Sequence, residues 1–128
     1  MIGEYRDIAE FITLCRPKKI VEVGIGRDFS TLKELEKMTA ANIIAVDISP
    51  SEGVLADDIT RPDMDIYKGS DVIYSIRPPP ELYPYLIDIA RKVKALLVIR
   101  PFSLDEPPKI FKLVNYKRAV LYIIDFRR

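Results

Sequence analysis

Apolar residues follow two alternating patterns along this chain, short continuous runs and longer stretches with helical spacing. The continuous runs predict strands over residues 19–23, 42–47, 53–56, 71–76 and 95–100. The stretches with helical spacing predict helices over residues 2–14, 28–37 and 81–93. Strands that are apolar throughout and alternate with helices are typical of a parallel sheet with both faces covered.

The last part of the chain has a different pattern. Two apolar segments, 111–116 and 119–126, are separated only by Lys117 and Arg118 and predict an antiparallel hairpin. A length of 128 residues is enough for one hydrophobic core and short for two. The pattern therefore predicts an α/β protein with three αβα layers, a doubly wound, mostly parallel sheet and a single domain spanning residues 1–128.

Two glycines mark the expected functional edge of this sheet. The first predicted strand leads directly into Gly24 and Gly26, ahead of a predicted helix. A Gly-x-Gly turn at such a place lets the backbone pass close to a ligand. Asp47 ends the next strand, 21 residues after Gly26. A carboxylate at that position can accept hydrogen bonds from both ribose hydroxyls, so a nucleoside-containing ligand is expected.

The residues around the turn favour a positively charged nucleoside ligand over a dinucleotide. A dinucleotide fingerprint needs a third glycine, and Phe29 stands in its place. The Asp28 carboxylate would compete for the helix N–H groups that bind a pyrophosphate. Seven acids against two bases lie between Asp47 and Asp71, which suits a ligand with a sulfonium and an ammonium group. S-adenosylmethionine is such a ligand. Binding of an NAD-type dinucleotide is kept as an alternative.

These residues carry a resemblance to a known family. The segment Glu22–Gly26 resembles the first motif of class I S-adenosylmethionine-dependent methyltransferases, and Asp47 resembles the acid that closes their second strand. The segments Ala56–Ile59 and Asp71–Ser75 are similar to those at their third and fourth strands. The whole chain also resembles a small, uncharacterised archaeal family with this Rossmann-like fold. The resemblance implies S-adenosylmethionine as cofactor, bound by Glu22, Gly24, Gly26, Asp47, Ile48, Asp57, Asp58 and Ser75.

The reacting end of the expected site departs from the methyltransferase pattern. Methyltransferases that act on amines commonly have an Asn or Asp before two prolines and an aromatic residue. Here Arg77 precedes the prolines, and an arginine side chain cannot accept a hydrogen bond from an amine. No catalytic residue is identified; Ser75 and Glu81 are the candidates, with Tyr83 as a further alternative. The predicted function is S-adenosylmethionine binding, with methyl transfer to an unknown substrate. The alternative is a non-catalytic binding or partner module that has lost methyl transfer.

Several of these residues have a simpler structural interpretation. Asp47 could cap a helix that starts at Ser49, and Asp57 and Asp58 could be solvated loop acids. The acids at 57, 58, 63 and 65 match no EF-hand spacing, so no metal site is expected. The chain contains no histidine, which excludes a Ser-His triad and a His-ligated metal.

The chain has few residues with which to enclose a substrate. Only the proline-rich segment Pro101–Lys109 lies between the fifth strand and the hairpin, and its prolines prevent a full helix. Two alternatives follow: a large substrate supplies its own surface, or a homodimer or a partner subunit completes the substrate pocket. Weak RNA binding is a further expectation, alongside the simpler one of solvated strand ends, for the basic residues Lys109, Lys112, Lys117, Arg118, Arg127 and Arg128.

Composition adds the expected location. The net charge is only +1, and the single Cys15 cannot form an internal disulfide. No apolar run approaches the ~20 residues of a membrane span, and the first residues do not resemble a signal peptide. A cytoplasmic protein with no membrane association is expected. The absence of glutamine and the abundance of charged residues resemble the composition of thermophile proteins.

Overall fold

The computed structural model describes residues 2–103 and 105–127. In chain order its elements are α1 (Ile2–Leu14), β1 (Lys19–Val23), α2 (Ser30–Met38), β2 (Asn42–Asp47), β3 (Val54–Ala56), α3 (Met64–Tyr67), β4 (Val72–Ile76), a 3-10 turn η1 (Pro80–Leu82), α4 (Tyr83–Val93), β5 (Leu96–Arg100), β6 (Lys112–Tyr116) and β7 (Ala119–Asp125).

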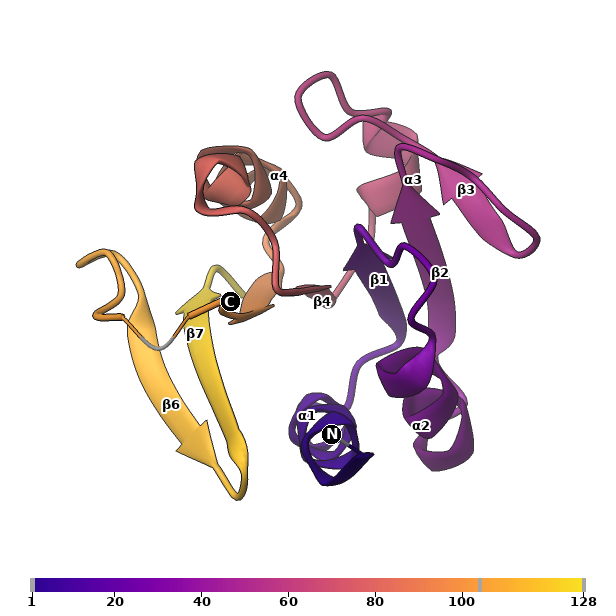
Figure 1. Cartoon of the computed structure of the whole chain (residues 1–128). Helices are drawn as coiled ribbons and strands as arrows, with labels where there is room; N and C mark the ends of the chain where they lie inside the picture. The colour runs from indigo at the N-terminus through magenta and orange to yellow at the C-terminus, as the bar shows by residue number, and fades with distance from the viewer. Residues whose placement is uncertain (1, 104, 128) are drawn as a thin grey trace.

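All seven strands form one sheet in the order β3-β2-β1-β4-β5-β7-β6. The first five strands are parallel, while β7 is antiparallel to both β5 and β6. Helices α1 and α2 lie on one face of the sheet, and α3 and α4 lie on the other (Figure 1). The predicted three-layer, doubly wound fold with a C-terminal antiparallel hairpin is confirmed.

The central strands are buried on both faces, which explains their continuous apolar runs. Successive side chains of a strand point to opposite faces. Val21 of β1 therefore packs in the core under α4, while its neighbour Ile20 packs in the core under α1. The same alternation places Ile73 and Val72 of β4 in opposite cores.

The element boundaries differ from the predicted ones in small ways. The helix predicted from residue 28 begins at Ser30, where Asp28 accepts hydrogen bonds from the Ser30 amide and hydroxyl at 3.0 and 2.6 Å. The helix predicted from residue 81 begins at Tyr83, after the η1 turn. Pro84 lies in the first turn of this helix, where a proline is tolerated. The short helix α3 was not predicted, because four residues carry too little periodicity.

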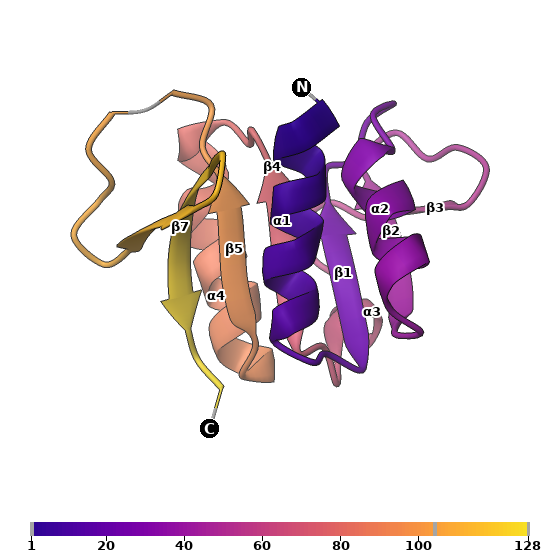
Figure 2. The same cartoon turned by 90° about the horizontal axis from the view of Figure 1, so that it is seen from below.

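The second half of the sheet is less completely covered than the first. None of the described residues between β5 and β6 is helical, as the prolines of this segment predict. The segment forms a loop that extends beside the sheet (Figure 2), and in Figure 1 no helix lies over β6 on the α4 side. No helix in the described part of the chain is long and apolar enough to cross a membrane.

Candidate functional site

The glycine turn closes over the end of β2. Gly24 and Gly26 have φ angles of 73° and 58°, a region that residues with a side chain rarely adopt. The amides of Gly24 and Ile25 donate to the carbonyl of Val46 at 2.9 and 3.2 Å. These two bonds hold the turn beside the carboxyl end of β2, where the sequence predicts a ligand.

Asp47 joins the glycine turn to the segment after β2. Its Oδ2 accepts a hydrogen bond from the Gly26 amide at 2.7 Å, and its Oδ1 accepts one from the Ser49 amide at 2.9 Å. The residues after Asp47 are not helical, so the alternative in which it caps a helix there is wrong. A carboxylate has about four acceptor positions. Two are used here, which leaves capacity for a ligand.

A cavity of ≈ 350 Å³ lies at this edge and is called the glycine-turn cavity below. Its polar and charged side chains come from the ends of β2 and β3, and Ile48 contributes an apolar side chain that is 72% exposed. The cavity is lined by Val23, Gly24, Val46, Asp47, Ile48, Asp57, Asp58, Ile59, Thr60 and Leu82. The structure thus brings five predicted cofactor-binding residues together: Gly24, Asp47, Ile48, Asp57 and Asp58.

The two acids after β3 are fixed by local hydrogen bonds. Asp57 accepts from the Asp63 amide at 3.0 Å and from the Tyr67 hydroxyl at 2.5 Å. Burial of Tyr67, together with the Asp57 carboxylate, raises the pKa of that hydroxyl. Asp58 uses one oxygen, Oδ1, for both the hydroxyl and the amide of Thr60, and the hydroxyl bond lowers its pKa. Asp57 therefore holds the α3 segment in place, and Asp58 has a carboxylate oxygen to spare.

A smaller cavity of ≈ 100 Å³ lies behind the turn and is called the rear cavity below. Gly24 lines both cavities. The remaining lining of the rear cavity consists of two carboxyl groups, a guanidinium, two hydroxyls and two aliphatic side chains, from Glu22, Asp28, Arg77, Tyr5, Thr31, Ile25 and Ile76. The Thr31 hydroxyl is buried and has no hydrogen-bond partner within the described part of the chain.

Glu22 is a buried carboxyl group at the rear cavity. It is 1% exposed, and its Oε1 accepts a hydrogen bond from the Tyr74 hydroxyl at 2.5 Å across the β1–β4 pair. Burial raises the pKa of Glu22 to about 8, although the Tyr74 bond acts in the opposite direction. Glu22 is therefore mostly protonated at neutral pH.

Arg77 brings positive charge to the same cavity in a strained backbone conformation. Its φ angle is 52°, and its amide donates to the Arg100 carbonyl at 2.7 Å. Its Nη1 lies 3.4 Å from the Tyr5 hydroxyl on α1. The nearby pair of Glu4 and Arg100 ties the start of α1 to the end of β5. Glu4 is buried, and its bond to Arg100 lowers its pKa.

The remaining predicted site residues lie outside both cavities. Ser75 is 2% exposed, and its hydroxyl donates to the Val23 carbonyl at 2.8 Å. Glu81 lies exposed on η1. Gly26 lines neither cavity but supplies the amide that binds Asp47. The sequence did not indicate Tyr5 or Thr31, because no motif marks them and only packing brings them to the turn.

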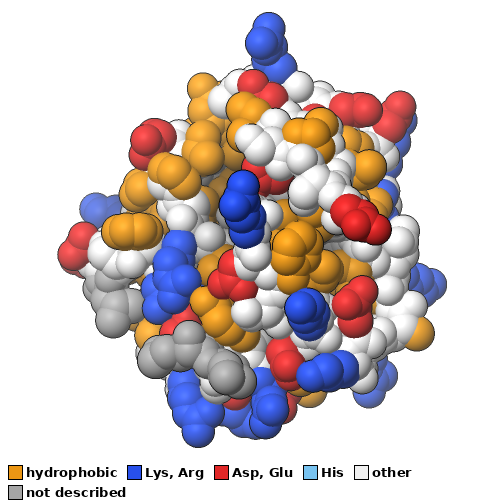
Figure 3. All heavy atoms as spheres, turned by 45° about the vertical axis from the view of Figure 1, so that its right-hand side comes forward, with side chains coloured by type: hydrophobic (Ala, Val, Ile, Leu, Met, Phe, Trp, Pro, Cys, Tyr) orange, Lys and Arg blue, Asp and Glu red, His pale blue; other side chains and the backbone are white. Residues whose placement is uncertain are grey.

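The predicted carboxylate-rich mouth is only partly present. Asp71 lies at the opposite end of β1, where it accepts from the amides of Lys18 and Lys19. Asp63 caps α3 and accepts from the Asp65 amide. On the face that Figure 3 brings forward, acidic and basic side chains are interspersed. Among the described residues, no three Cys, Asp or Glu side chains lie close enough together to hold a metal ion.

The basic C-terminal residues are partly engaged in ion pairs. Lys117 pairs with Glu10 of α1, and Arg127 pairs with Asp125 at 2.9 Å. The first pair joins the β6–β7 hairpin to α1, and the second is local to the end of β7. RNA binding by this region stays a prediction.

Residues 5–126 match the Uncharacterised protein family (UPF0146). The chain belongs to this family. A UPF0146 protein of the archaeon Methanocaldococcus jannaschii is 43% identical over 115 residues, which cover 83% of this chain and 82% of the relative. The predicted membership of a small archaeal family is confirmed.

Solved structures with a similar fold include methyltransferases and a domain with SAH bound. One is a candidate S-adenosylmethionine-dependent methyltransferase from Methanococcus maripaludis, with a TM-score of 0.67, 12% identity and coverage of 98% of this chain and 86% of that one. Another is the N-terminal domain of EvdMO1 with SAH bound, with a TM-score of 0.57, 12% identity and coverage of 93% and 65%. At this identity, the likeness shows the methyltransferase-like Rossmann fold and leaves activity to be argued from the site.

Proposed function

We propose that this UPF0146 protein binds S-adenosylmethionine, with the adenosyl group in the glycine-turn cavity and the amino-acid end toward the rear cavity. The observation that carries the proposal is the position of Asp47. The Gly26 amide fixes its carboxylate at the cavity, with acceptor capacity left over. SAH bound in a structural neighbour supports the same choice of ligand.

The glycine-turn cavity offers a partner for each part of an adenosyl group. Asp47 would accept hydrogen bonds from the ribose hydroxyls. Ile48 is exposed at the cavity and offers an apolar surface to the adenine ring. Asp58 would accept a bond from the adenine amine through Oδ2, which accepts no hydrogen bond from the described residues, because both Thr60 bonds go to Oδ1.

The rear cavity offers groups of both signs for an amino-acid end. Arg77 would bind the ligand carboxylate and Asp28 would bind the ammonium, while the protonated Glu22 would contribute a neutral carboxyl group beside them. The unpartnered Thr31 hydroxyl supports this assignment, because a buried hydroxyl without a partner costs about 1–3 kcal/mol. A dinucleotide fits less well, because the Asp28 carboxylate already accepts the Ser30 amide at the start of α2.

Whether methyl transfer follows is a separate step of the proposal. S-adenosylmethionine supplies an electrophilic methyl group, and the chain would orient the ligand and exclude water from it. The proposal also includes a homodimer or a partner subunit that completes the substrate pocket. The second candidate function is a binding module without transfer. It is favoured by the engagement of Ser75 with Val23 and by the exposed position of Glu81 outside both cavities.

Calorimetric titration of the purified chain with SAH, S-adenosylmethionine and NAD tests the proposal. We expect micromolar binding of the first two ligands and no measurable binding of NAD. Asp47→Ala should weaken SAH binding about 100-fold or more, because it removes charge-assisted bonds worth about 1.5–3 kcal/mol each. Asp65→Ala is the matched control, since Asp65 is an exposed acid that lines neither cavity.

The outcomes separate the alternatives. Unchanged SAH affinity in Asp47→Ala would show that the ribose lies elsewhere. Tight NAD binding with no SAH binding would replace the proposal by the dinucleotide alternative. Thermal unfolding of both variants without ligand checks that a loss of binding does not reflect loss of the fold.

A further inference from the structure

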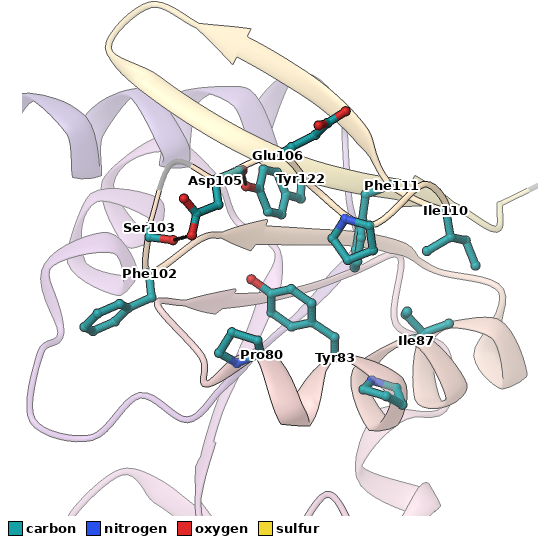
Figure 4. A pocket seen from close by; sticks show the side chains of 12 residues that line it. Pro80, Tyr83, Ile87, Phe102, Ser103, Asp105, Glu106, Ile110, Phe111 and Tyr122 are labelled. Carbon is teal, nitrogen blue, oxygen red and sulfur yellow. Dashed lines mark hydrogen bonds between the residues drawn. The ribbon is translucent and has the colours of Figure 1, made fainter.

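A second large cavity lies on the other side of η1 and is called the loop pocket below. Its volume is ≈ 440 Å³, within the range of about 300–1,000 Å³ typical of small-molecule sites. Tyr83 and Ile87 of α4 form one wall, Phe111 and Tyr122 form the opposite wall, and the loop after β5 closes one end (Figure 4).

The aromatic walls of the loop pocket brace one another. The rings of Tyr83 and Phe111 meet edge to face, with centroids 5.4 Å apart, and the Phe111 and Tyr122 rings lie 5.9 Å apart. All three side chains are buried, which fixes their orientation. At the rim, Phe102 and Ile110 are 71% and 52% exposed. A preformed pocket with aromatic walls and an exposed apolar rim is suited to a flat apolar group.

One end of the loop pocket is polar and acidic. The Ser103 hydroxyl donates to Asp105 Oδ2 at 2.8 Å, and the Tyr122 hydroxyl donates to the Asp105 carbonyl. The Tyr83 hydroxyl points toward this end (Figure 4) and has no hydrogen-bond partner among the described residues. Glu106 lines the pocket, but its carboxylate points away from it. No lysine or arginine is among the described residues that line the pocket.

We propose that the loop pocket binds a small aromatic amine. The ring would lie against Tyr83, Phe111 and Tyr122. The ammonium group would lie at the Asp105 carboxylate, and the free Tyr83 hydroxyl would accept one of its hydrogen bonds. Aromatic walls favour a cation near their faces, and the absence of a basic side chain in the lining disfavours an anionic ligand.

This site is separate from the proposed cofactor site. Leu82 lines the glycine-turn cavity, whereas Pro80 and Tyr83 on either side of it line the loop pocket. The η1 turn is thus a wall common to the two cavities. Binding in the loop pocket needs no cofactor, so it can be tested on the chain alone.

Three probes of one shape test the proposal by NMR titration of the full chain. Tyramine carries an ammonium group, 4-ethylphenol is its uncharged counterpart, and 4-hydroxyphenylacetate is an anionic one. We expect tyramine to shift the methyl signals of Ile87 and Ile110 and to bind about 10-fold more tightly than 4-ethylphenol. The anionic probe should bind more weakly than either.

Two variants locate the ligand and its charge. Ile87→Trp should fill the pocket and abolish the tyramine shifts. Leu55→Trp, a matched change at a residue that is 49% exposed on β3, should leave them intact. Asp105→Asn should remove the 10-fold preference for tyramine over 4-ethylphenol.

The proposal fails if tyramine binds Ile87→Trp as it binds the unmodified chain, or if 4-hydroxyphenylacetate binds as tightly as tyramine. If Ile87→Trp does not fold, Tyr83→Phe replaces it and should weaken tyramine binding about 3-fold or more. SAH titration of the same variants distinguishes this failure from that of the proposed function, because SAH affinity should be unchanged in all of them.

Discussion

The two halves of the sheet build their cavities in different ways. In the β3-β2-β1 half, residues directly after three neighbouring parallel strands form the glycine-turn cavity. In the β5-β7-β6 half, the loop pocket needs α4, a long loop and a hairpin from distant parts of the chain. The first cavity follows from strand order and short-range sequence, while the second depends on tertiary packing.

The backbone of the two halves shows the same contrast. The tight turns at the first cavity use Gly24 and Gly26 at positive φ angles. Before residue 71, four of the five described residues with positive φ are glycines, with Arg16 as the exception, whereas after it all three, Arg77, Lys94 and Lys117, carry side chains. A residue with a side chain pays a conformational cost in this region, so these turns are maintained by surrounding contacts. In the second half, sequence is therefore a weaker guide to local structure.

The largest expected effect concerns Glu22 in the first half. Its pKa rises from 4.5 to about 8 on folding because it is buried, so the unfolded chain loses this proton first as pH rises. The free energy of unfolding of the unmodified chain should then fall between pH 4.5 and 8, measured against the Glu22→Gln variant, which lacks this titrating group. The ceiling is about 5 kcal/mol, at about 1.4 kcal/mol for each pKa unit. Urea unfolding at several pH values measures the difference.

Glu81→Gln, at an exposed position on η1, controls for the change of residue type. A difference between Glu22→Gln and the unmodified chain that stays constant with pH would mean that Glu22 is ionised in the folded protein. The rear cavity would then carry a fixed negative charge, and the proposed match to a ligand ammonium would gain in strength.

A matched pair of leucines tests how differently the two halves are covered. Leu35 of α2 is 0% exposed, whereas Leu113 on the uncovered side of β6 is 47% exposed. Leu35→Ala should cost about 2–5 kcal/mol of unfolding free energy. Leu113→Ala should cost less than about 1 kcal/mol, since much of its surface is already in water. Equal costs would indicate that another molecule or copy covers β6 in solution.

The smallest expected effects come from the positive-φ turns. Gly26→Ala should destabilise by about 1–2 kcal/mol, because its φ of 58° disfavours a side chain. Lys94→Gly should stabilise by up to about 1 kcal/mol, because Lys94 ends α4 with a φ of 60°. Paired thermal unfolding measures both. Stability changes of opposite sign in the two variants would support the contrast between the halves, and changes of the same sign would contradict it.

The sequence predicted much of the first half correctly. The apolar runs placed β1, β2 and β4 within a residue of their observed bounds, because strands buried on both faces need continuous apolar residues. Five of the predicted ligand residues line one cavity because parallel strands end at one edge. The pattern failed for α3 and for Asp71, whose side chain lies at the opposite end of β1.

The sequence by itself determined the three layers, the parallel direction of the strands that alternate with helices, and the position of the glycine turn. These depend on periodicity and backbone freedom, which are local properties. Only the tertiary structure decided that Glu22 is buried beside Tyr74, that Tyr5 reaches Arg77, and that the region without a helix leaves an aromatic pocket. The Glu22–Tyr74 and Tyr5–Arg77 contacts join residues 52 and 72 positions apart, and burial and pKa values depend on packing that no local pattern encodes.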